Sequence, residues 1–586
     1  MAIIKISELP AADSPVSPSD VAPFLQNGVT KKASIDQFGF LPAGANAVTR
    51  TIQNKLRDSV SVLDFGAVGD GVTDDTAAIQ ATINAVQTSG GGAVYLPSGT
   101  YKITSALLMP YGVSMYGEGG TASILSCLNC NGINFNSASY DGGNMFFSDF
   151  AITSHAGSSG NWTAVESILP SGGVFGTDSR DGLYFYRLRI YDINQAFIIN
   201  ATWEAHFNEL KIFRVNNPFT FGNYSLVIRI TDCNMIYEGG FPSGGADRHG
   251  INLNGAVNEG VYIRGNQIFG FARAVSLNGV TTYTLINDND MFGSSYGVYI
   301  GNAANNVLTI KNNYFEISAN NAIGIYHANQ NAEAADTIVV DSNCFITGTS
   351  TGTKGIVLGV SSSTYVWNWR ILNNLFIGLK TVDIEANNVQ NVIIENNRCM
   401  STDPTNNIVV VGGNSLYNSN YVIHNKVAQG ISVDSADAAA GRTIVRENLI
   451  AGTQQFGAVW ASSGKIDGNT IGSVTPAAGT FTDLKATSKV FSASATQTIN
   501  NGQNGDLDYV LPNTSMHLVT CYLINATNVH YGPGVYLVVR QGTSTSVTTI
   551  TTFTDVTVTV TGSYKLNFAN ATGYNGNFAI SALRFY

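Results

Sequence analysis

The chain has 586 residues, of which 44% are apolar and only 12% are charged, and its formal net charge at pH 7 is −10. The apolar fraction excludes a disordered chain, because it is large enough to build a core. The acidic balance argues against nucleic-acid binding, which rewards clustered Lys and Arg. No apolar run is long enough to span a bilayer, and no basic start followed by an apolar stretch indicates a signal peptide.

The cysteines do not indicate a metal site or a disulfide framework. Six cysteines occur in the whole chain, and Cys127 and Cys130 form a lone CxxC. A structural zinc site needs four ligands, and no second pair follows at zinc spacing. We therefore expect neither a metal nor a cofactor.

The first segment with clear structure runs from Val60 to Ala85, "VSVLDFGAVGDGVTDDTAAIQATINA". A Walker loop requires GxxxxGK[ST], whereas this turn has no Lys and three Asp that would repel a phosphate. The pattern instead predicts a strand and then a helix whose N-terminus is capped by Asp74 and Asp75. Three residues at helical spacing give that helix an apolar face: Ile79, Ile83 and Val86. The following "GGGAVYLPSGTYKI" predicts two strands separated by turns.

The middle of the chain repeats one pattern, in which an apolar residue is followed by Asn three positions later. The repeated residues lie 21 to 32 positions apart: Asn234, Asn266, Asn289, Asn313, Asn343, Asn374, Asn397, Asn425, Asn448 and Asn469. Such periodicity predicts stacked coils, each burying its Ile, Val and Leu against the next. Asn tolerates the left-handed conformation and can bond to the coils above and below, so we expect a structural Asn ladder. Earlier segments, "LYFYRLRIYDI" and "FNELKIFRV", look like coils without the Asn.

The two ends of the chain differ from the middle. Residues 1–50 contain "KISELPAADSPVSPSDVAPFLQNGVTKKASIDQF", which is rich in turn formers and short of core residues. After the last coil comes "IGSVTPAAGTFTDL". Residues 488–586 are rich in Thr and Val, and the alternation in "SVTTITTFTDVTVTVTGSYKLNF" predicts antiparallel strands that form a sandwich.

Several of these stretches carry a family resemblance. "DFGAVGDGVTDDTAAIQATINA" followed by "GGAVYLPSGTYKI" resembles the opening of the pectate-lyase-like right-handed parallel β-helices, in which a helix caps the first coil. "SELPAA" and "FLQNGVTKKASIDQF" resemble phage tail-fibre and tailspike heads, "GANAVTRTIQNKLRDSVSVLDFGAVGDG" resembles a tailspike neck, and "IGSVTPAAGTFTDL" resembles a phage tail segment. Together they resemble a bacteriophage tailspike that degrades host surface polysaccharide.

The resemblance implies an all-β chain with four parts. These are a virion-attachment segment (1–50), a right-handed parallel β-helix with a capping N-terminal helix (51–472), a linker (473–487) and a C-terminal β-sandwich for trimerisation or carbohydrate binding (488–586). It also implies a homotrimer on the phage tail, within the virion, that acts outside the host cell. The expected partners are a bacterial capsular or other surface polysaccharide and the phage tail, without nucleic acid or membrane insertion.

The candidate site residues cluster between residues 203 and 316. Glycoside hydrolysis needs two carboxyl groups, and carboxylates are scarce here, so their clusters are informative. The candidate catalytic residues are Glu204, Glu238, Asp247, Glu316 and His249, and the candidate substrate-binding residues are Trp203, Tyr237, Arg248 and Asp290. Each has a structural alternative, such as a coil corner, a loop contact or a surface ion pair. We expect His327 and His424 to be structural.

Three functions remain open at this point. The first is an endo-acting glycoside hydrolase using two of Glu204, Glu238, Asp247 and Glu316. The second is a polysaccharide lyase, in which His249 or Tyr237 removes a proton and Arg248 holds a uronate. The third is a tail protein that binds glycan without cutting it.

Overall fold

The computed structural model describes residues 21–34, 38–135, 144–168, 181–238, 247–301, 305–328, 337–359, 366–412, 420–433, 443–446 and 448–450, together with the strands between 492 and 585. Two compact units follow one another along the chain, Met1–Ile471 and Gly472–Tyr586. No helix in the described parts is long and apolar enough to cross a membrane.

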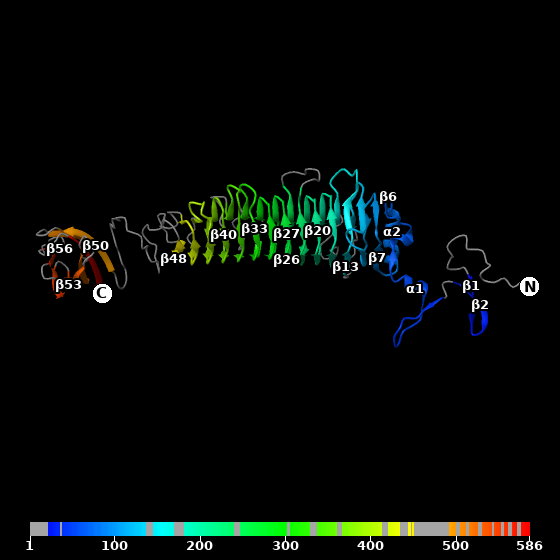
Figure 1. The fold of residues 1–586 in the computed structure, drawn as a ribbon, viewed down its shortest axis with the longest axis horizontal. Coiled ribbons are helices and arrows are strands. Elements are labelled where there is room, and N and C mark those ends of the chain that lie inside the picture. The colour runs from blue at the N-terminus through cyan, green and yellow to red at the C-terminus, as the bar shows by residue number, and fades with distance from the viewer. Residues whose placement is uncertain are drawn as a thin grey trace, which may run out of the picture. The chain divides into compact units, whose positions relative to one another are not determined.

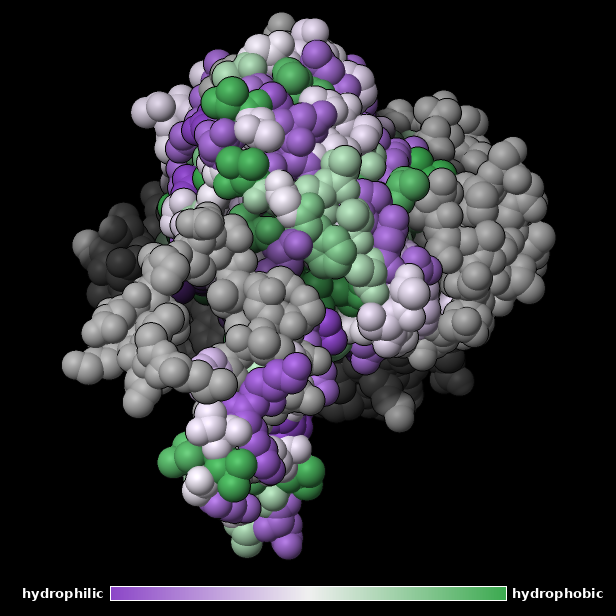
Figure 2. Space-filling view, turned by 90° about the vertical axis from the view of Figure 1, so that its right-hand side faces the viewer, coloured by the Kyte–Doolittle hydropathy of each residue, from purple (hydrophilic) through white to green (hydrophobic). Residues whose placement is uncertain are grey.

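The described N-terminal segment holds short elements. β1 (Val21–Gln26) and β2 (Val29–Ser34) form an antiparallel hairpin, and β3 (Gly39–Phe40) pairs with β4 (Arg50–Thr51). The helix α1 (Ile52–Leu56) follows directly. Figure 2 faces this end of the molecule and shows hydrophobic patches among hydrophilic ones.

Three long parallel sheets form the body of the first unit (Figure 1). Sheet 1 runs from β5 (Val60–Ser61) to β48 (Thr443–Arg446), sheet 2 from β6 (Asp70–Asp74) to β49 (Leu449–Ile450), and sheet 3 from β9 (Leu107–Leu108) to β47 (Ile431–Val433). Each strand pairs with the equivalent strands of the coils before and after it. The predicted right-handed parallel β-helix is confirmed.

The coils in the middle of the stack carry the residues discussed below. Sheet 1 contributes β10 (Val113–Gly117), β13 (Met145–Ser148), β16 (Leu183–Tyr186), β19 (Ala205–Asn208), β23 (Ile228–Thr231) and β26 (Asn258–Arg264). Sheet 2 contributes β17 (Arg189–Tyr191), β20 (Lys211–Phe213), β24 (Asn234–Ile236), β27 (Gln267–Phe269), β30 (Asp290–Phe292) and β33 (Tyr314–Glu316). Sheet 3 contributes β25 (His249–Leu253), β28 (Arg273–Leu277), β31 (Tyr296–Ile300) and β34 (Ile323–His327).

The N-terminal end of the stack is covered by α2 (Thr76–Thr88), as predicted. Its buried face includes the expected Ile79, Ile83 and Val86. The capping prediction is wrong in one respect. Asp75 occupies the N-cap position, but its buried carboxylate accepts from the backbone N–H groups of Val68 (2.6 Å) and Gly69 (3.1 Å) instead of from the helix. Asp74 accepts from the N–H of Thr76 at 3.1 Å, so it satisfies the first turn.

Inside the coils, identical side chains stack along the axis. The rings of Phe315, Phe345 and Phe376 lie 4.7 Å apart from one to the next and are almost parallel. They are fully buried with the inward Ile, Val and Leu residues of each strand. The core is therefore a continuous column that no single coil could bury alone.

The Asn ladder exists from Asn266 to Asn448. In one of its steps, the side-chain amide of Asn313 donates to Asn343 Oδ1 and to the carbonyl of Ile286, both at 2.9 Å. The Oδ1 of Asn313 accepts from the backbone N–H of Asn289 at 3.0 Å. Each ladder amide thus ties three coils together. Asn469, the last predicted member, lies outside the described residues.

The first predicted ladder member is wrong. Cys233 fills the ladder position of its coil, and its backbone N–H donates to Asn266 Oδ1 at 3.0 Å. Asn234 is one residue out of frame, because it follows Ile230 by four positions instead of three. It lies on sheet 2, and its amide donates to Gln267 Oε1 at 3.2 Å.

The C-terminal unit is built from antiparallel strands, as predicted. One sheet has the order β50 (Ser492–Ile499), β57 (Gly576–Phe585), β52 (Ser515–Ile524), β53 (His530–Gln541) and β54 (Ser544–Thr551). The other has the order β51 (Asn504–Val510), β56 (Lys565–Asn570) and β55 (Val556–Val560). Two such sheets are the arrangement of the expected β-sandwich.

We predict that replacing one ladder amide destabilises the coil stack. Asn343→Ala should lower the free energy of unfolding by about 1–3 kcal/mol, because Asn313 and the carbonyl of Ile310 lose buried partners. Asn234→Ala is the matched control and should change it by less than about 0.5 kcal/mol. Urea denaturation of both variants measures the difference. Equal destabilisation by the two substitutions would contradict the corrected ladder.

His327 gives the fold a pH-dependent weakness. Its side chain is buried, neither ring nitrogen has a hydrogen-bond partner, and burial lowers its pKa from 6.5 to about 3. His327 therefore binds a proton below pH 6.5 in the unfolded chain but only below about pH 3 in the folded chain. The folded state consequently loses stability as the pH falls from 6.5 to about 3. The expected structural role of His327 is confirmed.

His327→Leu should remove this penalty, since the residues in register with it are Ile300 and Leu358. The free energy of unfolding of the variant should exceed that of the wild type at pH 5 by about 2 kcal/mol more than it does at pH 8. Denaturation at the two pH values measures this gain, and the same difference at both would refute the assignment.

Candidate functional site

The structure places the predicted site residues on three faces. Trp203 and Glu204 precede β19 on sheet 1. Asp290 and Glu316 belong to β30 and β33 of sheet 2. The other five lie at the turn from sheet 2 to sheet 3, which leads from the end of β24 to the first residue of β25: Tyr237, Glu238, Asp247, Arg248 and His249. The four predicted carboxylates therefore do not form one site within a single chain.

The residues at the turn do come together. The guanidinium carbon of Arg248 lies 4.2 Å from the centre of the Tyr237 ring. Oδ1 of Asp247 lies 3.0 Å from Nε2 of His249. Glu238 is exposed and interacts electrostatically with Arg214, which follows β20 on sheet 2. Two pairs of the predicted residues are thus in contact, Tyr237 with Arg248 and Asp247 with His249.

The next coils supply side chains that the sequence did not point to. Arg273 begins β28, in register with His249, and its Nη2 lies 3.3 Å from Asp247 Oδ1. Its guanidinium also lies 3.8 Å from the centre of the Tyr299 ring. Tyr299 packs against Tyr296 and Tyr326, with ring centres 5.3 and 5.5 Å away. We call Asp247, His249, Arg273, Tyr296, Tyr299 and Tyr326 the sheet-3 cluster.

Arg273 is held from two directions. Besides Asp247, it donates to Asn278 Oδ1 at 3.4 Å, and the amide of Asn278 donates to Asn252 Oδ1 at 3.1 Å. The side chain of Arg273 is 21% exposed and that of Asp247 is 69% exposed. An accessible carboxylate is therefore positioned by a largely buried cation, beside a surface of half-buried tyrosines.

His249 is more buried than the other candidates at this turn. Only 6% of its side chain is exposed, so it offers little surface to a substrate. Burial lowers the pKa of His249, against the opposing effect of Asp247, and the ring is neutral at pH 7. Its Nε2–H is then a donor to the Asp247 carboxylate. This contact holds the Asp247 carboxylate in place, which is the structural alternative for His249.

Glu204 forms a second, separate cluster on sheet 1. Its Oε1 lies 2.8 Å from Nε2 of His206 and 3.3 Å from Nη1 of Arg229. Burial, followed by the charge of Arg229, lowers the pKa of His206. Tyr184 lies beside His206, with ring centres 4.7 Å apart, and Trp203 is 40% exposed. His206 and Arg229 fix the Glu204 carboxylate on a face that lacks Asp247.

The two predicted residues on sheet 2 stand apart from both clusters. Asp290 is in register with Tyr314. Glu316 is in register with Phe292 and Ile346, and its side chain is exposed. Neither carboxylate forms an ion pair with a described residue, so sheet 2 offers no preorganised acid–base pair here.

Sequence comparisons match only parts of the chain. Residues 59–151 match the family described as rhamnogalacturonase A/epimerase, pectate lyase-like. The tail spike protein of Shigella phage Sf6 is 29% identical over 171 residues, 28% of this chain and 26% of that protein. The mannuronan C5-epimerase AlgE4 of Azotobacter vinelandii is 43% identical over 75 residues, 12% of this chain and 14% of the epimerase. The chain thus spans about a quarter or less of these relatives.

Structural neighbours extend the likeness over the fold. A mutant tailspike protein of E. coli bacteriophage HK620, solved in complex with a pentasaccharide, superposes with a TM-score of 0.50 and 14% identity, over 94% of this chain and 97% of that one. The pre-mature gene product 12 of bacteriophage phi29 also gives a TM-score of 0.50, with 13% identity, over 69% of this chain and 56% of that one. The resemblance to a tailspike with a pectate-lyase-like β-helix is confirmed.

Proposed function

We propose that this chain is a tailspike depolymerase that binds a bacterial surface polysaccharide along sheet 3 and cleaves it beside Asp247. The observation that carries the proposal is the sheet-3 cluster, in which an exposed carboxylate is fixed by a buried His and a largely buried Arg. Fixed carboxylates of this kind serve acid–base catalysis, because little reorganisation is needed during the reaction.

The tyrosines give the glycan a surface on which to lie. Tyr296, Tyr299 and Tyr326 belong to two consecutive coils, β31 and β34, and Arg273 precedes them on β28. Tyrosine combines an apolar ring with a hydroxyl that can form hydrogen bonds, which suits the mixed surface of a sugar. Because the coils repeat along the axis, neighbouring sugar residues meet successive rows of side chains.

Hydrolysis at this position requires a second carboxyl group. Glu238 is the one we propose, since it directly follows Tyr237 while Asp247 directly precedes Arg248. The Tyr237–Arg248 contact at 4.2 Å joins the two ends of the turn that carry these acids. In this reaction one carboxyl protonates the leaving oxygen, and the other activates water or attacks the sugar.

Elimination is a second candidate, and the presence of two arginines favours it. Arg248 follows Asp247 in the chain and Arg273 lies 3.3 Å from it, and guanidinium groups pair well with the carboxylate of a uronic acid. A base, Tyr237 or Asp247, would remove the C5 proton. The electron pair then forms the C4–C5 double bond, and the C4 oxygen departs with a proton from solvent or an acid.

The remaining assignments follow from the tailspike resemblance and stay proposals. Three copies of the chain would assemble, with residues 1–50 attached to the phage tail. Residues 51–472 would form the catalytic part, 473–487 a linker, and 488–586 a trimerisation or carbohydrate-binding part. The proposed substrate class is a capsular or related surface polysaccharide.

Replacing the central carboxylate tests where the reaction takes place. Asp247→Asn should lower kcat on the polysaccharide by at least about 100-fold, because a group that transfers protons is lost. Glu204→Gln, on sheet 1, is the matched control and should keep kcat within about threefold. Rates of chain shortening, with circular dichroism to verify folding, supply the comparison. The reverse pattern would move the active site to sheet 1.

The products distinguish the reaction classes. The wild-type protein should shorten one capsular polysaccharide in a panel from encapsulated bacteria, as followed by size-exclusion chromatography. Hydrolysis gives new reducing ends without a chromophore, whereas elimination also gives an enol ether that absorbs near about 235 nm. Tight binding of a polysaccharide without any shortening would contradict the depolymerase proposal and leave a glycan-binding tail protein.

A further inference from the structure

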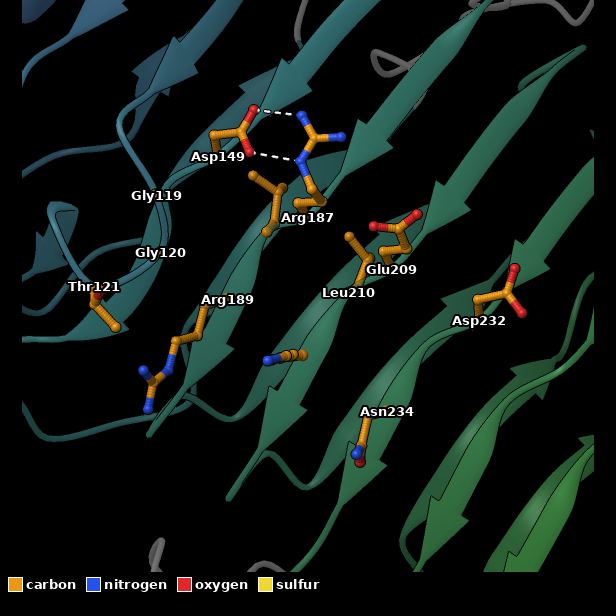
Figure 3. Close-up of a pocket in the computed structure, with 12 residues that line it drawn as sticks. Gly119, Gly120, Thr121, Asp149, Arg187, Arg189, Glu209, Leu210, Asp232 and Asn234 are labelled. Carbon is orange, nitrogen blue, oxygen red and sulfur yellow. Dashed lines mark hydrogen bonds and ion pairs between the residues drawn. The ribbon is translucent and has the colours of Figure 1, made fainter.

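A groove of about 510 Å³ lies at the corner between sheets 1 and 2, on a different part of the coil from the sheet-3 cluster (Figure 3). Gly119 and Gly120, from the turn after β10, line one end, and Asp232 and Asn234 line the other. We call this hollow the corner groove. Its volume falls within the range of small-ligand sites in proteins, roughly 300–1,000 Å³.

The corner groove has an acidic row and a basic row. The acidic row comes from the corner itself, where Glu209 and Asp232 occupy equivalent positions on consecutive coils. The basic row comes from sheet 2, where Arg189 and Lys211 are in register on β17 and β20. Figure 3 shows Glu209 and Asp232 along one side of the groove and Arg189 on the other.

The four groups of the two rows form no direct ion pair with a described residue, although Glu209 interacts electrostatically with Arg187. Among the described residues, the side chains of Glu209, Asp232 and Lys211 form no hydrogen bond or ion pair. The guanidinium of Arg189 forms none either, and it lies 4.7 Å from the centre of the Phe213 ring. The stacked ring therefore supports Arg189 while its N–H groups stay available to a ligand.

Closed ion pairs line or adjoin the corner groove as well. At its edge, Arg187 binds both carboxylate oxygens of Asp149, each at 2.7 Å. On the same corner row beyond the groove, Arg264 lies 3.3 Å from Asp288. The corner groove thus combines one closed ion pair, Arg187–Asp149, with acids and bases that form no ion pair among the described residues.

The charges specify the chemistry of the ligand. The formal charges of the two carboxylates and the two cations sum to zero, so the four groups together give a strongly charged ligand no net electrostatic attraction. Phosphate would be repelled by Glu209 and Asp232, and a metal ion by Arg189 and Lys211. A ligand that presents hydrogen-bond donors and acceptors together fits, and the hydroxyl groups of a sugar do so. We propose that the corner groove is a second glycan-binding site, which holds the polysaccharide without cutting it.

This inference rests on the proposed function only for the identity of the glycan. A second point of attachment on the same polymer would raise the effective concentration of uncut chain near sheet 3. Long polymer would then bind more tightly than short fragments, because only long polymer can occupy both sites at once.

Removing one charge from each row tests the second site. In the Asp247→Asn background, Glu209→Gln with Lys211→Gln should weaken binding of the polymer that the wild type shortens by about tenfold, measured by biolayer interferometry. Asp288→Asn, on the same corner row but outside the groove, is the matched control and should leave the affinity unchanged. In the wild-type background, the double substitution should leave kcat on short fragments unchanged.

Three results would overturn the inference. Unchanged polymer affinity in the folded double variant removes the second site alone, while cleavage by the wild type still supports the proposed function. If the double variant lost kcat on short fragments by as large a factor as it lost polymer affinity, the groove would be part of the active site. A wild-type protein that binds no polysaccharide in the panel overturns both this inference and the proposed function.

Discussion

The faces of the β-helix all depend on the turn between sheet 1 and sheet 2. In coil after coil, one residue adopts the left-handed conformation, as Asp288 (φ 56°), Asn312 (55°) and Asn373 (56°) do. The buried Asn that follows each of them bonds to the coils on both sides, for example Asn313 to Asn343 at 2.9 Å. Because these amides have no water to replace a lost partner, they hold the register of the stack.

A fixed register turns single residues into rows. His249 is followed on the next coil by Arg273, and Arg273 by Tyr296, so an acid held at one coil meets a cation and tyrosines from the coils beyond. The same rule builds the corner groove from Arg189 and Lys211 on sheet 2. A rigid column can in this way present a different chemistry on each of its faces, and a long glycan can contact more than one.

The sequence predicts features that depend on neighbouring residues, but not contacts between coils that depend on the lengths of the intervening turns. The capping helix, the repeated coils and most of the Asn ladder follow from short-range patterns, and Tyr237, Asp247, Arg248 and His249 are close in the chain. Arg273 lies 24 positions after His249, and only the lengths of the intervening turns bring it opposite. For the same reason the sequence groups Glu204 with Asp247, although Glu204 precedes β19 of sheet 1 and Asp247 precedes β25 of sheet 3. The repeat pattern assigns the ladder position to Asn234 instead of Cys233, and a shift of one residue along a strand moves the side chain to the other face.

The central claim is that the glycan lies on sheet 3 and is cleaved beside Asp247. The most direct test is a crystal structure of the Asp247→Asn variant with a fragment of the polysaccharide that the wild type shortens. Sugar density should run over Arg273 and Tyr299, with the scissile bond next to position 247. Density confined to sheet 1 beside Glu204, with sheet 3 empty, would contradict the claim.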